Sequence, residues 1–573
     1  MSVSGRVNFE VQVQRGGKWH ISDVLPSEQV ARRKAEELLA QKTTEGVRII
    51  KEAHFGNDSR RETEIFKQMK EVEKDEDFSI TPVDEAPVCE RLSDYYETQA
   101  RTTMARLFSK YLEKHELTPL ELLHSHKSLK RALNLDTMVP SAVDKIASLH
   151  ARATGQDSRK RKDIIYEAVD RIAARAREID NKPLPELKNS TLDELWAKID
   201  AKSSDADERR FLANVALTRA SLTWSGWLGK MSELLPLAKA SKDERAREMV
   251  DEMMSDILIA KTVIKDVIGV SKHMGDALQR MLDLIEGKCQ PTKFAAEELL
   301  DLLNVLFSED LLPKSRQVLY DRIERDLKSA VKLTTSDEAN ADKDFFVQLL
   351  NRVVTDHGVV GGRPIALGLT ERWARIMNIG GATGRRKAMD EVRDKLSSTT
   401  RKFVYLIAMY DPKEDPDLTD VITTQLKAFA AQLDTVQKIA PEAKTQKARL
   451  QEATAVQRLV LDSPLEDGLR TLLANKFDAV VSDYLITNKV IERIDDKSLT
   501  FRDRATRLVA FCTGGVLTEG RAKTIARDSV VSYLKRKDFV SEFTLGIAEP
   551  AEKERAIREF YVLLSKTGFD VRA

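Results

Sequence analysis

Hydrophobic and polar residues alternate strictly near the start of the chain. Residues 7–13 read Val-Asn-Phe-Glu-Val-Gln-Val, and a second run of strand character extends from Trp19 to Leu25 after a turn at Gly16 and Gly17. A period of two places every other side chain on the same face of a strand. The two runs and the turn between them predict a β-hairpin.

A helix and a further strand follow this hairpin. Pro26 opens a helical pattern that extends to about Gln41, and residues 47–51 return to strand character. Residues 1–70 are thus predicted to form a ββαβ module, with residues 64–69 as a fourth strand in an alternative interpretation. A sheet this small has an edge or a face that needs a cover, which favours contact with the rest of the chain or with a partner.

Residues 71–90 are strongly acidic. They contain eight acidic residues against Lys74 alone, and Pro82 and Pro87 oppose helix formation. We interpret this segment as an extended, solvated linker.

From residue 91 onward the dominant hydrophobic period is 3.6, which predicts a large multi-helical body built as a bundle or an array of hairpins. Four helix starts are indicated by a hydroxyl residue followed three positions later by a glutamate, at Thr118, Thr191, Ser241 and Ser463. The fold class is therefore mainly α, with the ββαβ module in front.

Two interruptions divide this body. Pro183 and Pro185 break the helical pattern, and residues 334–343 form a polar run. The predicted subdomains are residues 91–185, 186–335 and 336–573.

The longest predicted element is a central helix over residues 242–286. The segment contains no proline, and its apolar residues are spaced three and four apart. A bend at Gly269 or Gly275 is the alternative. Met253 and Met254 lie on this helix, and flexible methionine side chains adapt to different partner surfaces. We therefore regard them as candidate interaction residues, although a helix that is apolar on more than one side also suits the middle of a bundle.

The composition narrows the class of protein. The 93 Lys and Arg residues nearly balance the 92 Asp and Glu residues, which argues against a globally basic nucleic-acid binder. Cys89, Cys289 and Cys512 are far apart, so neither a disulfide framework nor a thiolate zinc site is expected. We find no signal peptide and no apolar stretch that could span a membrane, and we expect a soluble, cytoplasmic protein.

A basic run at Arg159, Lys160, Arg161 and Lys162 opens an amphipathic stretch. It is a candidate surface for an acidic partner or for phosphates, and a solvated helix start is the alternative. We also consider that the acidic linker lies across this run.

Glycines cluster before another predicted helix. Gly380, Gly381 and Gly384 precede Arg385, Arg386 and Lys387, and free N–H groups beside three cations are the ingredients of an anion site. The spacing does not match a Walker A loop, and a simple connection between helices is the alternative.

Trp224 and Trp227 are three residues apart on a predicted helix. Core packing is the ordinary role for such residues, whereas an exposed pair would mark an interaction surface.

These observations favour a non-catalytic protein. The chain has no Gly-x-Ser-x-Gly and no His-Glu-x-x-His motif, and its histidines lack the spacing of metal ligands, so we expect no metal and no cofactor. The function that we predict is a scaffold, adaptor or regulatory protein that contacts protein partners, or a second copy of itself, through amphipathic helices. An enzyme or regulator that binds a phosphate-bearing ligand at residues 380–387 is the first alternative. Nucleic-acid binding through basic helical patches is a weaker one.

Overall fold

The structure is a computed structural model. It describes residues 7–15, 18–39, 44, 46–55, 59–69, 78–188, 190–336, 338, 340–381, 383–513, 516–566 and 569. The chain divides into two compact units, the first formed by Met1–Ile80 and Arg131–Asp144 and the second by Thr81–Lys130 and Lys145–Ala573. The predicted subdomain boundaries near residues 185 and 335 fall within the second unit and stay predictions.

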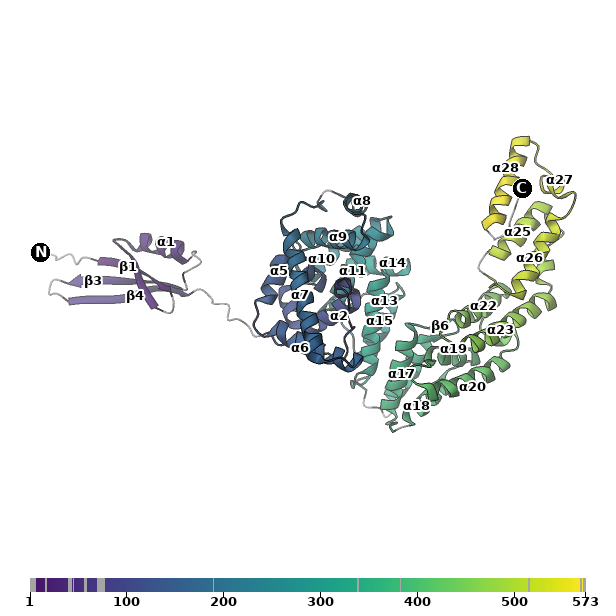
Figure 1. The fold of residues 1–573 in the computed structure, drawn as a ribbon, viewed down its shortest axis with the longest axis horizontal. Helices are drawn as coiled ribbons and strands as arrows, with labels where there is room; N and C mark the ends of the chain where they lie inside the picture. Colours follow the sequence, from purple (N-terminus) through teal and green to yellow (C-terminus); the bar gives the residue numbers. More distant parts are fainter. Residues whose placement is uncertain are drawn as a thin grey trace. The chain divides into compact units, whose positions relative to one another are not determined.

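The first unit contains a four-stranded antiparallel sheet covered by one helix (Figure 1). The sheet order is β2-β1-β3-β4, so the alternative with a fourth strand is correct and the module is ββαββ. Its elements are β1 Val7–Arg15, β2 Lys18–Leu25, α1 Glu28–Leu39, β3 Gly46–Phe55 and β4 Ser59–Met69.

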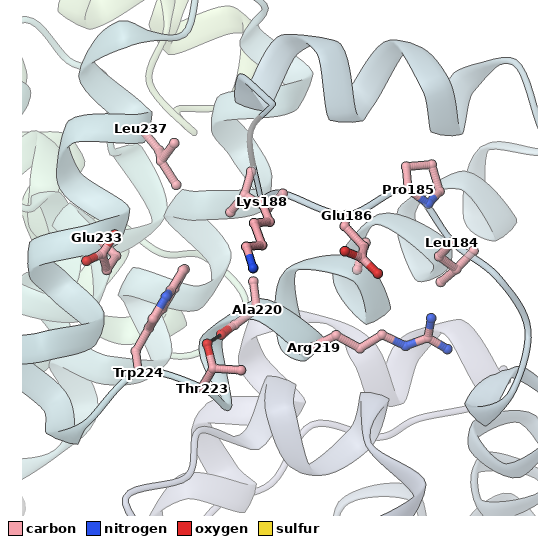
Figure 2. Close-up of a pocket in the computed structure, with 12 residues that line it drawn as sticks. Leu184, Pro185, Glu186, Lys188, Arg219, Ala220, Thr223, Trp224, Glu233 and Leu237 are labelled. Carbon is pink, nitrogen blue, oxygen red and sulfur yellow. Dashed lines mark hydrogen bonds between the residues drawn. The ribbon is translucent and has the colours of Figure 1, made fainter.

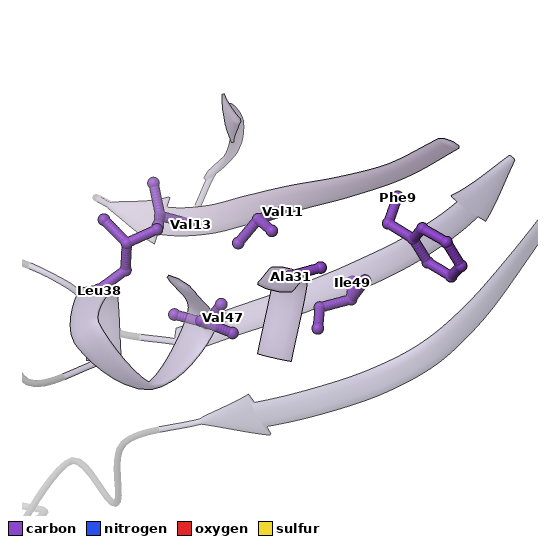
Figure 3. Packing of buried hydrophobic residues seen from close by; sticks show 8 residues of the cluster. Phe9, Val11, Val13, Ala31, Leu38, Val47 and Ile49 are labelled. Atoms are coloured by element: carbon purple, nitrogen blue, oxygen red, sulfur yellow. The ribbon is translucent and has the colours of Figure 1, made fainter. Parts of the chain in front are cut away.

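The alternation in the sequence produces two unlike faces of this sheet. Val11 pairs with Ile49 and Val13 with Val47, and these side chains lie under α1 in a buried cluster (Figure 3). The opposite face is polar, and there Arg48 lies over the ring of Trp19, with 4.6 Å between the guanidinium carbon and the ring centroid. The sheet therefore buries one face against its own helix.

The second unit is helical, and the mainly α fold class is confirmed. Its first helices, which include two that the division between the units crosses, are α2 Thr98–Leu107, α3 Ser109–His115, α4 Pro119–His124, α5 His126–Leu133, α6 Met138–Thr154, α7 Ser158–Asp180, α8 Leu192–Asp200, α9 Ala206–Ser221, α10 Gly226–Ala240, α11 Glu244–Ile259, α12 Lys261–Ile268, α13 Met274–Ile285, α14 Glu297–Ser308 and α15 Pro313–Lys328.

The described chain continues in the same way as far as Lys566. The later elements are α16 Ala341–Val353, β5 Val354–Thr355, β6 Gly358–Val359, α17 Gly362–Ile376, α18 Gly384–Lys395, α19 Thr399–Met409, α20 Pro416–Gln432, α21 Val436–Ile439, α22 Gln446–Leu461, α23 Asp467–Thr487, α24 Val490–Ile494, α25 Phe501–Thr513, α26 Arg521–Leu534, α27 Phe539–Phe543 and α28 Pro550–Lys566. None of the helices in the described part of the chain combines the length and the apolar content that crossing a membrane requires.

The predicted continuous helix over residues 242–286 is wrong. The segment forms α11, α12 and α13, which are interrupted at Ala260 and again from Gly269 onward. Gly269 has a φ of 81°, and a Cβ there would lie 2.9 Å from the carbonyl oxygen of Lys293. Close approach of another segment ends the helix at this glycine, whereas Gly275, the other predicted bend, lies in the first turn of α13.

The predicted helix starts are only partly confirmed. Thr118 and Thr191 each form a reciprocal capping box with a glutamate, ahead of α4 and α8. Ser241 and Ser463 do not cap: Asp243 caps α11 through the N–H of Arg245, and α23 begins at Asp467.

The end of the acidic segment lies against the helical body. Residues 71–77 are outside the described residues, and residues 78–90 form neither helix nor strand. The N–H of Thr81 donates to the carbonyl of Leu107 at 2.8 Å, and the side chain of Val83 is buried. This part of the predicted linker is therefore extended but not freely solvated.

Candidate functional site

A cavity of about 510 Å³ opens beside Trp224 (Figure 2). Helix α9 supplies Ala216, Arg219 and Ala220, and the turn that follows it supplies Thr223 and Trp224. Glu233 and Leu237 come from α10, and the extended chain from Leu184 to Lys188 forms the remaining wall.

Local sequence explains this extended wall. Proline disfavours helical backbone in the residue before it, so Pro183 and Pro185 prevent α7 from continuing beyond Asp180. Arg219 then fixes the end of α7, because its guanidinium group donates to the carbonyls of Ile179 at 2.8 Å and of Lys182 at 3.0 Å. Arg219 is consequently a structural residue of the cavity wall.

The lining combines apolar surface with charges that have no partner. Ala216 and Leu187 are buried, and Trp224 and Leu237 are half-buried. The side chains of Glu186, Lys188 and Glu233 are exposed and make no hydrogen bond or ion pair with any described residue. Figure 2 shows Lys188 reaching toward Ala220 between Trp224 on one side and Glu186 on the other. The cavity can thus receive an apolar group and present charges to its neighbours.

The two predicted tryptophans line different cavities. Trp227 lies in the first turn of α10, with the Lys230 ammonium 5.3 Å from its ring centroid, and borders a second cavity of about 380 Å³. Both rings are half-buried, so neither of them belongs wholly to the core.

The predicted interaction surface at Met253 and Met254 is wrong. Both side chains have an exposed fraction of 0%, and residues 249–259 are all buried. Helix α11 lies against α2, α4, α8, α9, α10 and α15. The alternative that this helix lies in the middle of a bundle is therefore the correct one.

The basic run at 159–162 is only partly exposed. Arg159 and Lys160 are exposed, whereas the Arg161 side chain has an exposed fraction of 0%. Its guanidinium group donates to a Glu90 carboxylate oxygen at 3.0 Å and to the carbonyl of Cys89 at 3.2 Å. The end of the acidic segment does contact this run, and Arg161 is part of that internal contact.

The predicted anion site at residues 380–387 forms the start of α18. Gly380 and Gly381 are exposed and the helix begins at Gly384, as the sequence predicts. Arg386 and Lys387 are exposed, and Arg385 lies 3.7 Å from Asp415. The described cavities are lined by other residues, so binding at this loop stays a prediction.

A buried ionic network at the centre of the body was not predicted. Glu252 on α11 accepts hydrogen bonds from Lys314 at 2.6 Å and from Arg210, and lies 3.7 Å from Arg101. Asp256, one turn later, accepts from Arg101 Nε at 3.0 Å and from the N–H of Leu120 at 2.8 Å. The partners come from four different helices, so no local pattern in the sequence signals this network.

Burial and charge act differently on these two carboxylates. Burial raises the pKa of Glu252, but Arg101, Arg210 and Lys314 outweigh it and bring the value down to about 2. Burial raises the pKa of Asp256 to about 6, against the lowering effect of Arg101. The network holds the helices of the body together, and its two carboxylates are buried and already paired, so we regard it as structural.

Comparison with known protein families, with curated proteins and with solved structures finds no match. Among the described residues, no group of three or more His, Cys, Asp or Glu side chains is placed to hold a metal ion.

Proposed function

We propose that this protein is a non-catalytic adaptor that binds a segment of a partner protein in the cavity beside Trp224. The observation that carries the proposal is the combination of apolar floor, half-buried aromatic ring and partnerless charges in one opening. Its volume of about 510 Å³ is within the usual range of ligand sites.

The lining defines the chemistry of the partner segment. An apolar anchor of the partner would contact Ala220, Trp224 and Leu237, and aromatic residues of this kind are frequent interface hot spots. Arg219 also lines the cavity, but its guanidinium group is committed to backbone carbonyls at the end of α7. Among the lining charges without a described partner, Glu186 and Glu233 outnumber Lys188, so a basic residue next to the anchor would complement these groups. The proposed occupant is therefore a short extended segment with an apolar side chain beside a lysine or arginine.

Selection from a random peptide library tests this function. The full chain is the bait, and selected peptides are measured against wild type, Trp224→Ala and the control Leu472→Ala, which removes an apolar side chain that is 55% exposed. We expect apolar-basic peptides whose affinity falls about 30-fold or more in Trp224→Ala, as hot-spot losses of about 2 kcal/mol imply. The control should leave their affinity unchanged.

A charge reversal checks the rim independently. Glu186→Lys should shift the selected sequences from basic toward acidic residues, because it reverses the net charge of the three partnerless groups. Peptides that bind wild type and Trp224→Ala equally well would contradict the proposed function, as would a library that yields no binding peptide.

A further inference from the structure

Three arginines line the second cavity, beside Trp227. Arg106 comes from α2, and Arg322 and Arg325 come from consecutive turns of α15. The cavity has a volume of about 380 Å³, and the extended residues Thr81 and Pro82 form part of its wall. All of these residues belong to the second unit.

Two of these arginines, Arg106 and Arg325, form no ion pair with any described residue. Arg322 lies 3.9 Å from Asp326. Arg325 donates from Nε to the carbonyl of Asp321 at 3.2 Å, which leaves the rest of its guanidinium group without a hydrogen-bond partner. Arg106 forms no hydrogen bond or ion pair with any described residue.

The carboxylates that line the cavity do not change this picture. Asp256 is committed to Arg101 and to the N–H of Leu120. Asp326 is the partner of Arg322, and Glu113 on α3 forms no ion pair with any described residue. With Asp256 counted as neutralised, the three arginines exceed the two remaining lining carboxylates by one charge.

The electrostatics agree with a crowded cationic site. Burial, then the charges of Arg106 and Arg322, lower the pKa of Arg325, and the nearby carboxylates of Asp326 and Asp321 only partly offset this effect. Like charges held together in a partly buried cavity repel each other, and an anion between them would relieve that repulsion.

Apart from these charged residues and the hydroxyls of Thr81 and Ser109, the lining is apolar. It includes the Trp227 ring and the side chains of Leu112, Leu117, Ile259 and Pro119. We propose that this cavity binds a small organic anion whose carboxylate or phosphate group is held by Arg106 and Arg325 and whose apolar part contacts Trp227. Guanidinium groups suit both head groups, because their N–H donors match the paired oxygens of either.

Calorimetric titration of the full chain tests this site. The probes are phenyl phosphate, 3-phenylpropionate and the neutral 3-phenylpropanol, at constant ionic strength. We expect both anions to bind and the alcohol to bind at least ten-fold more weakly than the better anion, about the loss of one charge-assisted hydrogen bond. The tighter of the two anions identifies the head group.

Variants locate the binding. Arg106→Gln and Arg325→Gln should each lower the affinity for the tighter-binding anion about 10- to 100-fold, as the loss of a hydrogen bond to a charged group implies. Arg386→Gln is the matched control, since Arg386 is exposed at the start of α18 and does not line this cavity. Loss of binding in the Arg386 variant alone would assign the anion to residues 380–387 and overturn the proposal. If neither anion binds at millimolar concentration, the proposal is also overturned.

Stability without a ligand supplies a second readout. A binding arginine that is held against like charges should not be needed for folding, so Arg106→Gln should melt at the temperature of wild type or above it. If this variant unfolds or melts lower, Arg106 is a structural residue and the proposal fails.

Discussion

Replacing Arg101 with methionine removes the guanidinium group that Glu252 and Asp256 share. The Arg101 side chain has an exposed fraction of 0%, and its Nε lies 3.0 Å and 3.1 Å from the two carboxylate oxygens of Asp256. Further donors reach the carbonyls of Tyr96 and Glu252. Methionine fills much of the space but leaves these acceptors in an apolar interior. Breaking a buried pair in this way costs about 3–5 kcal/mol.

Thermal unfolding followed by circular dichroism measures the effect. Unfolding entropy is about 2 cal/mol/K per residue, so each kcal/mol moves the melting temperature of the second unit, about 480 residues, by about 1 °C. The expected fall is therefore about 3–5 °C. Arg91→Met is the matched control, because Arg91 is 82% exposed and pairs with Asp94 at 3.3 Å. A surface pair is worth about 0–1 kcal/mol, and this variant should move the melting temperature by about 1 °C at most.

The pH dependence tests the cause. The pKa of Asp256 in the folded protein, about 6, is above its ordinary value of 3.8. The folded state therefore disfavours the ionised carboxylate, and this group lowers the stability of the fold as pH rises through this interval. Without Arg101 the ionised form of Asp256 is still less favourable. The stability lost in Arg101→Met should therefore be smaller at about pH 5 than at about pH 8. Adding Asp256→Asn should recover part of the loss at the higher pH. Equal shifts in Arg101→Met and Arg91→Met, or a loss independent of pH, would refute this reasoning.

Two further predictions concern the same helical body. The pKa of Glu252 is lowered from 4.5 to about 2, so its ion pairs stabilise the fold above about pH 4.5 and this contribution, about 3 kcal/mol, is lost as pH falls toward 2. In urea unfolding, the free energy of unfolding of wild type should exceed that of Glu252→Gln, and the difference should become smaller below about pH 4.5. A difference that stays constant with pH would contradict this prediction. Gly520→Ala should cost about 1–2 kcal/mol, because Gly520 has a φ of 154° and a Cβ would lie 2.7 Å from the Asp478 carboxylate that accepts the N–H of Arg521 at the start of α26. Gly229→Ala in α10, where a Cβ meets nothing within 4 Å, should instead stabilise, and equal melting temperatures for the two variants would show the reasoning to be wrong.

Signals confined to a few residues predicted the structure well. The alternation at residues 7–13 predicted a strand with one buried face, and Thr118 and Thr191 predicted helix starts, because hydrogen bonds between neighbours decide these features. The same signal failed at Ser241. Its hydroxyl donates to Asp193, a residue 48 positions earlier, and Asp243 caps the helix instead.

Features set by distant contacts were not predictable in this way. The three helices that replace the expected long one each keep a period of 3.6, so the apolar pattern continues across both breaks. The break at Gly269 depends on the approach of Thr292 and Lys293. The sequence did not predict the cavity beside Trp224. Trp224 was a candidate interaction residue and the prolines at 183 and 185 marked a boundary, and no local pattern shows that they meet.

Overall neutrality conceals how charges are placed in the fold. The 93 cationic residues and 92 acidic ones nearly cancel, and the buried carboxylates of α11 are matched by cations and N–H donors from other helices. In such a protein a basic run along the sequence is a poor guide to binding, since Arg161 in the most basic run is buried against Glu90. A cation that its own fold leaves without a partner is the more informative signal. Arg106 has no partner among the described residues, and its position beside Arg325 in a cavity with a largely apolar wall is the physical reason to look for an anion there.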